Sequence, residues 1–135
     1  MMTIKGDVVA SIRHIAQQEY PHESCGALVG RAEAITEVLP LPNSTTEEAR
    51  RRFRILPEDY RRAEANAEAA GKELLGFFHS HPDHPASPSA YDLEHAWPNL
   101  TYLIVSVTRK AAGDLTAWRL AEDRSQFEQK LLITR

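Results

Sequence analysis

Two histidines one residue apart follow an apolar run in the segment GFFHSHPDHPASPSAYDL, residues 76–93. Side chains at positions i and i+2 of a strand project from the same face, so His79 and His81 are expected to lie together. Two imidazoles on one face suit a protein core poorly, because each needs a hydrogen-bond partner in apolar surroundings. They suit a shared metal ion, and zinc is the expected metal.

A third metal ligand is expected from the Ser-x-x-Asp pattern that follows the histidines. Ser89 has the position of a helix N-cap, which places Asp92 in the first turn with its carboxylate facing the loop after His81. Catalytic zinc commonly has three protein ligands and one open position, so the sequence predicts one zinc ion held by His79, His81 and Asp92. Ser-x-x-Asp alone is a common helix start, but the two patterns together are specific. His84, in the same loop, is either a surface residue or a substitute ligand.

Hydrolysis at such a site also needs a carboxylate that takes a proton from water and passes it to the leaving group. Glu23 is the candidate, just before the apolar run CGALVG. A solvated glutamate in a turn would have the same local sequence. Spacing alone does not choose Glu23 over three other glutamates, namely Glu19, Glu73 and Glu94.

The elements that would position these residues follow from periodicity and from helix start and stop signals. Helices are expected from an Asp7 N-cap to about Tyr20, from Pro57 to a cap at Gly71, and over 89–97. Strands are expected over 25–30, 35–42, 73–81, 100–107, 115–120 and 127–133, the first two as a hairpin. Interleaved helices and strands predict an α/β (α+β) fold with a mixed central β-sheet flanked by helices.

The length of 135 residues predicts a single domain, 1–135, with a sizeable core. The sequence contains no apolar run of the ~18 residues that a membrane span needs, and its start lacks the pattern of a signal peptide. The only cysteine, Cys25, excludes an internal disulfide and favours a reducing cytoplasm. A net charge of −3 argues against a nucleic-acid-binding protein.

Positive charge is concentrated between Arg50 and Arg62, where six arginines and two acidic residues give +6 − 2 = +4. A solvated, salt-bridged face would account for this cluster. The sharper hypothesis is a site for a substrate carboxylate, with Arg51, Arg52 and Arg54 as candidate substrate-binding residues, because arginine can bind a carboxylate through two hydrogen bonds.

The combined pattern resembles the JAMM motif of the MPN-plus metalloproteases. It consists of His79-Ser80-His81-Pro82, Ser89-x-x-Asp92 six residues later, and an upstream Pro21-x-Glu23-x-Cys25-Gly26. The resemblance extends over about 8–118, with no departure at a ligand position. It implies zinc ligands at His79, His81 and Asp92, an acid/base at Glu23, a hydroxyl donor to the oxyanion at Ser89, and a fold like that of cytidine deaminase.

Within this family the chain is most similar to the short, stand-alone bacterial branch. The shared segments are Pro85-Ala86, Pro88-Ser89, Asp92-Leu93, Ala96, Tyr102–Ser106 and Ala117–Arg119. Family members cleave after the C-terminal Gly-Gly of ubiquitin or a ubiquitin-like protein, and this branch trims ubiquitin-like sulfur-carrier proteins or releases cysteine from them. The resemblance thus implies a zinc metallopeptidase in cysteine or sulfur metabolism, with such a carrier as its substrate. A single cysteine beyond Gly-Gly would present a free carboxylate to the arginine cluster.

Three alternatives remain at this point. A metal-free MPN domain could serve as a protein-binding scaffold. Cys25 could act as the nucleophile of a cysteine hydrolase if it were exposed and its pKa depressed. A zinc nucleobase deaminase is disfavoured, because it requires a Pro-Cys-x-x-Cys segment and the chain has one cysteine.

Overall fold

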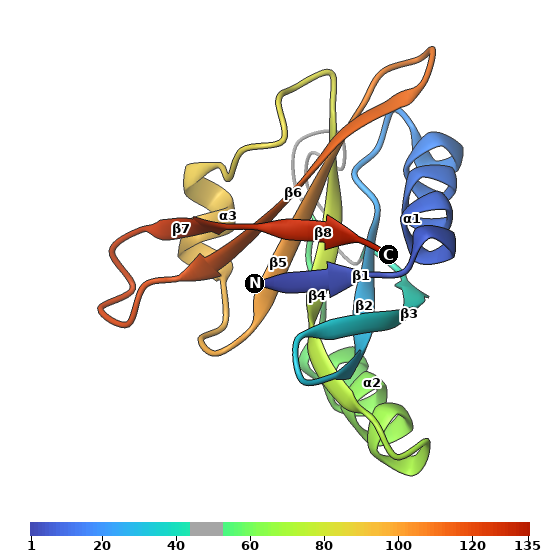
Figure 1. Cartoon of the computed structure of the whole chain (residues 1–135). Coiled ribbons are helices and arrows are strands. Elements are labelled where there is room, and N and C mark those ends of the chain that lie inside the picture. The colour runs from blue at the N-terminus through green and yellow to red at the C-terminus, as the bar shows by residue number, and fades with distance from the viewer. Residues whose placement is uncertain (44–52) are drawn as a thin grey trace.

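The computed structural model describes residues 1–43 and 53–135, and in these residues it contains three helices and one mixed eight-stranded sheet. The strand order is β7-β6-β5-β4-β2-β3-β1-β8 (Figure 1). The strands are β1 (Met2–Ile4), β2 (Cys25–Arg31), β3 (Ala34–Leu41), β4 (Glu73–Pro82), β5 (Thr101–Val107), β6 (Ala112–Leu120), β7 (Phe127–Lys130) and β8 (Leu132–Thr134). The helices are α1 (Gly6–Glu19), α2 (Pro57–Ala69) and α3 (Ala90–His95). The α+β architecture predicted from the sequence is confirmed.

The two outer strands of the sheet, β7 and β8, are neighbours in the chain and are separated only by Leu131. The expected single strand over 127–133 is therefore two strands, of which β7 pairs with β6 and β8 pairs with β1 (Figure 1). The backbone N–H of Met2 also donates to Leu131 O. Strand β1 was not predicted, since three residues are too few for periodicity to reveal.

Apolar side chains cover both faces of the sheet. On one face, Ile12 and Ala16 of α1 pack with Phe78 and Leu103. On the other face, Ala63 of α2 and the residues that follow α3 pack with Phe77 and Tyr102. Side chains alternate along a strand, so the histidines of β4 lie on the same side as Phe77, away from α1. The catalytic chemistry expected from the sequence would therefore take place on the α2 and α3 side.

Strand β4 occupies the middle of the sheet, antiparallel to β2 and parallel to β5. His79 is paired with Cys25 on one side and Ile104 on the other, and His81 is paired with Ser106. The histidines follow the apolar segment of β4 but still lie within the paired part of the strand. Two ladders fix the backbone on both sides of His79, which gives its ring a rigid support.

Helix boundaries differ from the expectation at the start of α1 and at the end of α3, which ends at His95 and not at residue 97. Helix α1 has Lys5 as its N-cap, without a side-chain capping bond, so Asp7 lies in the first turn and the predicted Asp7 N-cap is wrong. The physical reason is that β1 leads directly into the helix, and Lys5 O accepts from Val8 N and Val9 N. At the end of α2, Gly71 has a φ of +73° just after the C-cap, as the sequence predicted. None of the described helices is long and apolar enough to cross a membrane.

Candidate metal centre

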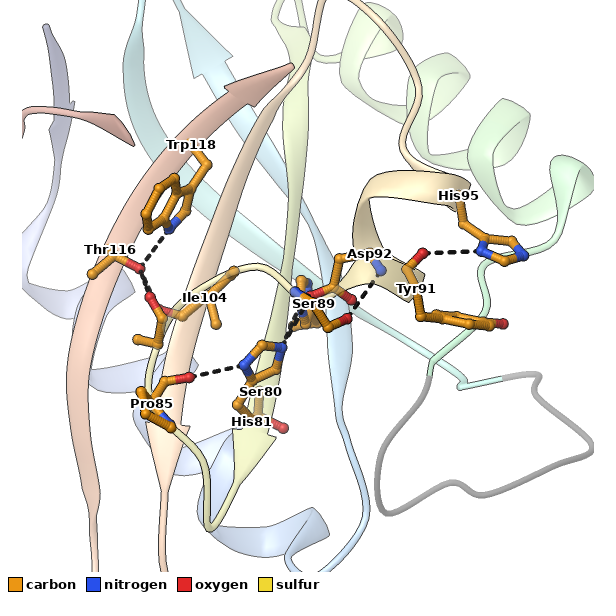
Figure 2. Close-up of polar contacts among 12 residues, drawn as sticks. Ser80, His81, Pro85, Ser89, Tyr91, Asp92, His95, Ile104, Thr116 and Trp118 are labelled. Carbon is orange, nitrogen blue, oxygen red and sulfur yellow. Dashed lines mark hydrogen bonds and ion pairs between the residues drawn. The ribbon is translucent and has the colours of Figure 1, made fainter. Parts of the chain in front are cut away.

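Three side-chain atoms converge at the junction of β4 and α3. His79 Nε2, His81 Nε2 and Asp92 Oδ2 lie 3.1 Å from one another in every pair. All three residues are buried, with at most 7% of their surface exposed. Figure 2 shows Asp92 on α3 beside the ring of His81 on β4. The structure thus brings together the three residues that the sequence predicted as metal ligands.

Hydrogen bonding does not account for this triangle of donor atoms. A proton on one corner can be directed at only one other corner, so at least one of the three contacts has like partial charges facing each other. Tetrahedral ligands about 2.0–2.1 Å from a zinc ion lie about 3.3–3.4 Å from one another, close to the observed spacing. Two imidazole nitrogens and a carboxylate oxygen also form a ligand set that zinc accepts. The residues present therefore fit a bound zinc ion.

The electrostatics of the site suit metal ligands. Burial lowers the pKa of His79, only partly offset by Asp92, so its ring is neutral and has a free lone pair. Burial alone would raise the pKa of Asp92, but the two histidines and the backbone N–H of Ser89 lower it overall. Burial also opposes the charged form of His81, yet hydrogen bonds to Asp92 and Pro85 raise its pKa. An ionised Asp92 thus lies beside a neutral imidazole.

Asp92 is held by the start of α3. Its backbone N–H donates to Ser89 Oγ at 3.0 Å, and the Ser89 backbone N–H donates to Asp92 Oδ2 at 2.9 Å. This reciprocal pair is a capping box, and it confirms the predicted N-cap at Ser89. The same carboxylate oxygen both caps the helix and faces the histidines, so folding of the first turn orients the candidate ligand.

Glu23 is the glutamate that the structure places at this site. It is 4% exposed, whereas Glu19, Glu73 and Glu94 are exposed. A carboxylate oxygen of Glu23 and nitrogens of both histidines lie within 4.8 Å of one another, so this group can also hold a metal ion. Burial, with a further effect from Asp92, raises the pKa of Glu23 to about 9. Its Oε1 is buried with no hydrogen-bond partner among the described residues.

A serine pair fixes the backbone next to Glu23. The backbone N–H of Ser24 donates to Ser80 Oγ at 2.8 Å, and the Ser80 N–H donates to Ser24 O at 3.0 Å. The side chain of Asn43 donates to Glu23 O at 3.0 Å. The sequence did not identify Ser24, Ser80 and Asn43 as the residues that hold this backbone. Alternation along β4 was the available signal, since Ser80 must face away from the histidines and needs a buried partner of its own.

Two cavities meet at the candidate metal centre. The first, called here the apolar cavity, has about 250 Å³ and is lined by His79, Asp92, Arg54, His95 and a largely apolar set that includes Phe53, Ile55, Phe77, Ala96, Trp97 and Tyr102. The second, called the polar cavity, has about 500 Å³ and is lined by Glu23, His81, His84, Pro85, Ser87 and Ser89. The aromatic wall was not predicted from the sequence. Phe53 stacks on the His79 ring with centroids 4.3 Å apart.

The remaining candidates have distinct surroundings. Ser89 is exposed to the polar cavity, and since its oxygen accepts from Asp92, its hydroxyl proton is free to point at a ligand. His84 is exposed and lines the same cavity, outside the group of metal-binding atoms found in the described residues. Arg54 lines the apolar cavity, whereas the candidates Arg51 and Arg52 lie outside the described residues.

Cys25 lacks the properties of a nucleophile. It is 1% exposed, and its sulfur lies 3.6 Å from the carbonyl oxygens of Leu41 and Pro42. Burial, together with Glu23 and other nearby acidic groups, raises the pKa of the thiol to about 12. A neutral, buried thiol argues against the cysteine-hydrolase alternative.

Comparison with known proteins gives relatives over most of the chain. Residues 5–121 match a family model described as prokaryotic homologs of the JAB domain. A desampylase from Haloferax volcanii is 35% identical over 105 residues, which cover 76% of this chain and 75% of the relative. A desampylase from Pyrococcus furiosus is 33% identical, covering 82% and 76%. A probable TtuB-protein conjugate cleaving protease from Thermus thermophilus is 34% identical, covering 64% and 57%.

Solved structures have the same architecture. A protein from Salinibacter ruber superposes with a TM-score of 0.77 at 39% identity, covering 99% of this chain and 92% of the other. A protein from Desulfitobacterium hafniense superposes with a TM-score of 0.86 at 29% identity, covering 100% and 93%. A JAB1/MPN domain protein from Archaeoglobus fulgidus, at 20% identity and a TM-score of 0.64 over 99% and 97%, has the same fold.

Proposed function

The chain belongs to the family of prokaryotic JAB-domain proteins, and on that basis we propose that it is a zinc metallopeptidase. Its proposed reaction is hydrolysis of the peptide or isopeptide bond after the C-terminal Gly-Gly of a ubiquitin-like sulfur-carrier protein. The convergence of His79, His81 and Asp92 beside a buried glutamate is the observation that carries the proposal.

One zinc ion per chain would be held by His79, His81 and Asp92. Their donor atoms are 3.1 Å apart, whereas the Glu23 oxygen belongs to a looser group that spans up to 4.8 Å. We therefore assign Asp92 as the third ligand and leave Glu23 free for proton transfer. When bound, zinc would polarise the scissile carbonyl and lower the pKa of water.

Glu23 takes the proton of the attacking water and delivers it to the leaving nitrogen in this proposal. Its partnerless oxygen supports the role, because the carboxylate has no competing hydrogen bond among the described residues. Its raised pKa also makes it a stronger base than an exposed glutamate once it is ionised. The free hydroxyl proton of Ser89 would stabilise the negative oxygen that forms on the attacked carbonyl.

The two cavities suggest how the substrate is oriented. Glu23 lines the polar cavity and must reach the leaving nitrogen, so we place the leaving group there. The tail that ends in Gly-Gly would then approach along the apolar cavity, beside its aromatic rings. Arg54 lies on that side, so we propose that it pairs with a carboxylate of the carrier tail. The sequence hypothesis had placed the arginine cluster at the leaving-group side, and this role is retained as a hypothesis for Arg51 and Arg52.

The relatives support a protein conjugate as the substrate class, since one of them is named for cleaving TtuB-protein conjugates. The sulfur-carrier identity and a place in cysteine or sulfur metabolism are our proposal. So is a cytoplasmic location, which rests on the single unpaired cysteine. A metal-free scaffold is the competing function, and a buried ligand triangle with an unpaired glutamate disfavours it, since burying such groups without a ligand destabilises a fold.

The deciding experiment measures zinc content and cleavage on the same preparation. We expect about one zinc per chain by elemental mass spectrometry, cleavage of a carrier protein extended beyond Gly-Gly, loss of cleavage with a chelator, and recovery on adding zinc. A scaffold would bind the carrier without cleaving it, whether or not zinc was present.

A further inference from the structure

The loop between β4 and α3 contacts the candidate metal centre through one carbonyl group. His81 Nδ1 lies 2.9 Å from Pro85 O. A carbonyl oxygen only accepts hydrogen bonds, so once His81 binds a metal through Nε2, its ring proton is on Nδ1 and is donated to Pro85 O. The lone pair is then on Nε2, the atom that faces Asp92 Oδ2 at 3.1 Å. The position of Pro85 O thus selects the ring form that can bind a metal.

Thr116 of β6 fixes this loop one residue further on. Its Oγ1 donates to Ala86 O at 2.6 Å. Ala86 is 7% exposed, whereas Pro85 and Ser87 on either side of it are exposed. The contact follows from strand register, because His79 pairs with Ile104 and Ile104 with Thr116, which forms one row across three strands. Thr116 therefore holds the loop from the same face of the sheet as the metal centre.

Trp118 determines where the Thr116 hydroxyl points. The indole Nε1–H of Trp118 donates to Thr116 Oγ1 at 2.8 Å (Figure 2). The hydroxyl has a single proton, and two carbonyl oxygens compete for it, Ala86 O at 2.6 Å and Ile104 O at 3.5 Å. With a lone pair engaged by the indole, the proton is directed at the nearer carbonyl. Thr116 and Trp118, two residues apart on β6, thus lie on the same face, and the indole orients the hydroxyl.

We propose that Thr116, oriented by Trp118, is a positioning residue for His81. It anchors Ala86 and thereby the adjacent Pro85 carbonyl, which keeps the His81 proton on Nδ1 and leaves Nε2 free for the metal. The inference rests on the proposed function only in taking His81 as a metal ligand. Nothing in the chemistry requires Thr116 or Trp118 to touch the substrate.

The test compares variants that remove or keep one hydrogen bond. Thr116→Val keeps the shape but removes the hydroxyl, and Thr116→Ser keeps the hydroxyl. Trp118→Phe keeps an aromatic ring but removes the indole N–H that bonds to Thr116 Oγ1. Thr101→Val is the matched control, since Thr101 is a buried strand threonine whose hydroxyl contacts Met2 Sδ at 3.8 Å, not the loop. The readouts are the His81 ring form, from imidazole ¹⁵N shifts of the metal-free protein at an alkaline pH where the ring is neutral, and the zinc Kd, from competition with a chelator.

We expect Thr116→Val to weaken zinc binding by about 10-fold or more, the range found for partners of metal-binding histidines, and to give His81 a mixture of ring forms. Thr116→Ser and Thr101→Val should behave like wild type, and Trp118→Phe should shift both readouts in the direction of Thr116→Val. A single Nδ1–H form and unchanged zinc affinity in Thr116→Val would overturn the proposal. An equal loss of zinc affinity in Thr116→Val and Thr101→Val would also overturn it, because it would indicate a general destabilisation of the fold.

The two proposals fail separately. If the wild-type chain bound no zinc, the proposed function would fail, while the ¹⁵N measurement on metal-free protein would still test whether Thr116 sets the ring form of His81. If Thr116→Val did not fold, Trp118→Phe and Thr116→Ser would carry the comparison, because the first removes the N–H that orients the Thr116 hydroxyl and the second keeps that hydroxyl.

Discussion

Glu23 and Asp92 are two buried carboxylates of one site whose pKa values are displaced in opposite directions. Burial and the charge of Asp92 raise the pKa of Glu23 to about 9. The pKa of Asp92 is lowered, because its histidine partners and the Ser89 N–H outweigh its burial. Paired groups with pKa values pushed apart commonly divide the roles of an active site. Here the ionised Asp92 suits a ligand, and Glu23 suits a proton carrier.

Replacing Glu23 should stabilise the metal-free protein at high pH. The folded-state pKa of Glu23 is raised above its ordinary value of 4.5 to about 9, so the fold favours the protonated form. Its favourable contribution is complete below about pH 4.5 and is lost as pH rises toward 9. Glu23→Gln avoids this loss, which at pH 8 is on the order of a few kcal/mol.

Thermal unfolding of chelator-treated protein at pH 5 and pH 8 checks this expectation. The Tm of Glu23→Gln should exceed that of wild type clearly at pH 8 and little at pH 5. Tm differences that are the same at both pH values would show that burial of this carboxylate has no such cost.

Removing a metal ligand should abolish zinc retention without unfolding α3. Asp92→Asn keeps an oxygen that can accept from the Ser89 N–H but removes the negative charge at the triangle. His81→Ala removes one imidazole. We expect both variants to lose zinc and activity, while His14→Ala, an exposed histidine of α1, serves as the control. Full zinc occupancy and normal turnover in either ligand variant would contradict the assignment.

Acid should release the metal. Ligand imidazoles must be unprotonated, and the pKa of His81 is raised in the metal-free site, where its hydrogen bonds to Asp92 and Pro85 outweigh its burial. Protons therefore compete with zinc at His81 as pH falls. Zinc content measured after dialysis should drop below about pH 6, near the ordinary pKa of histidine, together with activity. A zinc content that is constant down to pH 4 would exclude histidine ligation.

The capping role of Ser89 and its proposed role as a hydroxyl donor can be separated by two substitutions. Ser89→Ala removes both the cap, worth about 1 kcal/mol, and the hydroxyl proton proposed for the oxyanion, worth up to about 10²–10³-fold in kcat. Ser89→Asn keeps a capping side chain without the hydroxyl. Loss of kcat in both variants, with a lowered Tm only in Ser89→Ala, is expected. Normal kcat in Ser89→Asn would leave Ser89 with the capping role alone.

Arg54 should act on carrier binding and not on the choice of leaving group. Two substrates separate these effects, a carrier ending Gly-Gly-Cys and the same carrier extended by several residues. Since Arg54 lines the apolar cavity, Arg54→Ala should raise KM for both substrates by a similar factor. A changed preference between the two substrates would indicate that Arg54 contacts the leaving group.

The candidate metal site was more predictable than its surroundings. Alternation on a strand and a helix cap are local rules, so they brought His79, His81 and Asp92 together before any tertiary contact was known. Glu23 was one of four candidates, because its burial depends on the pairing of β2 with β4, which spans more than fifty residues. The apolar cavity and the link from Thr116 to Ala86 also bring together segments that are far apart in the sequence, and no local pattern encodes them.

The fold was likewise predictable where local patterns decide it and not where long-range pairing does. Helices and long strands followed from periodicity, whereas β1 and the split between β7 and β8 depend on pairing of the two chain ends. The wrong N-cap of α1 has a similar origin, since the strand that precedes it sets where the helix begins.

The proposed zinc site would cleave after Gly-Gly with Glu23 as the proton carrier. The most direct measurement is the intact mass of a Gly-Gly-Cys carrier after incubation with zinc-loaded wild type and with Glu23→Gln of equal zinc content. Wild type should release one cysteine and leave a carrier ending in Gly-Gly. Glu23→Gln should be slower by about 10²–10⁴-fold, the usual worth of general acid–base catalysis. An uncleaved carrier with wild type, or a Glu23→Gln rate within tenfold of wild type, would contradict the account.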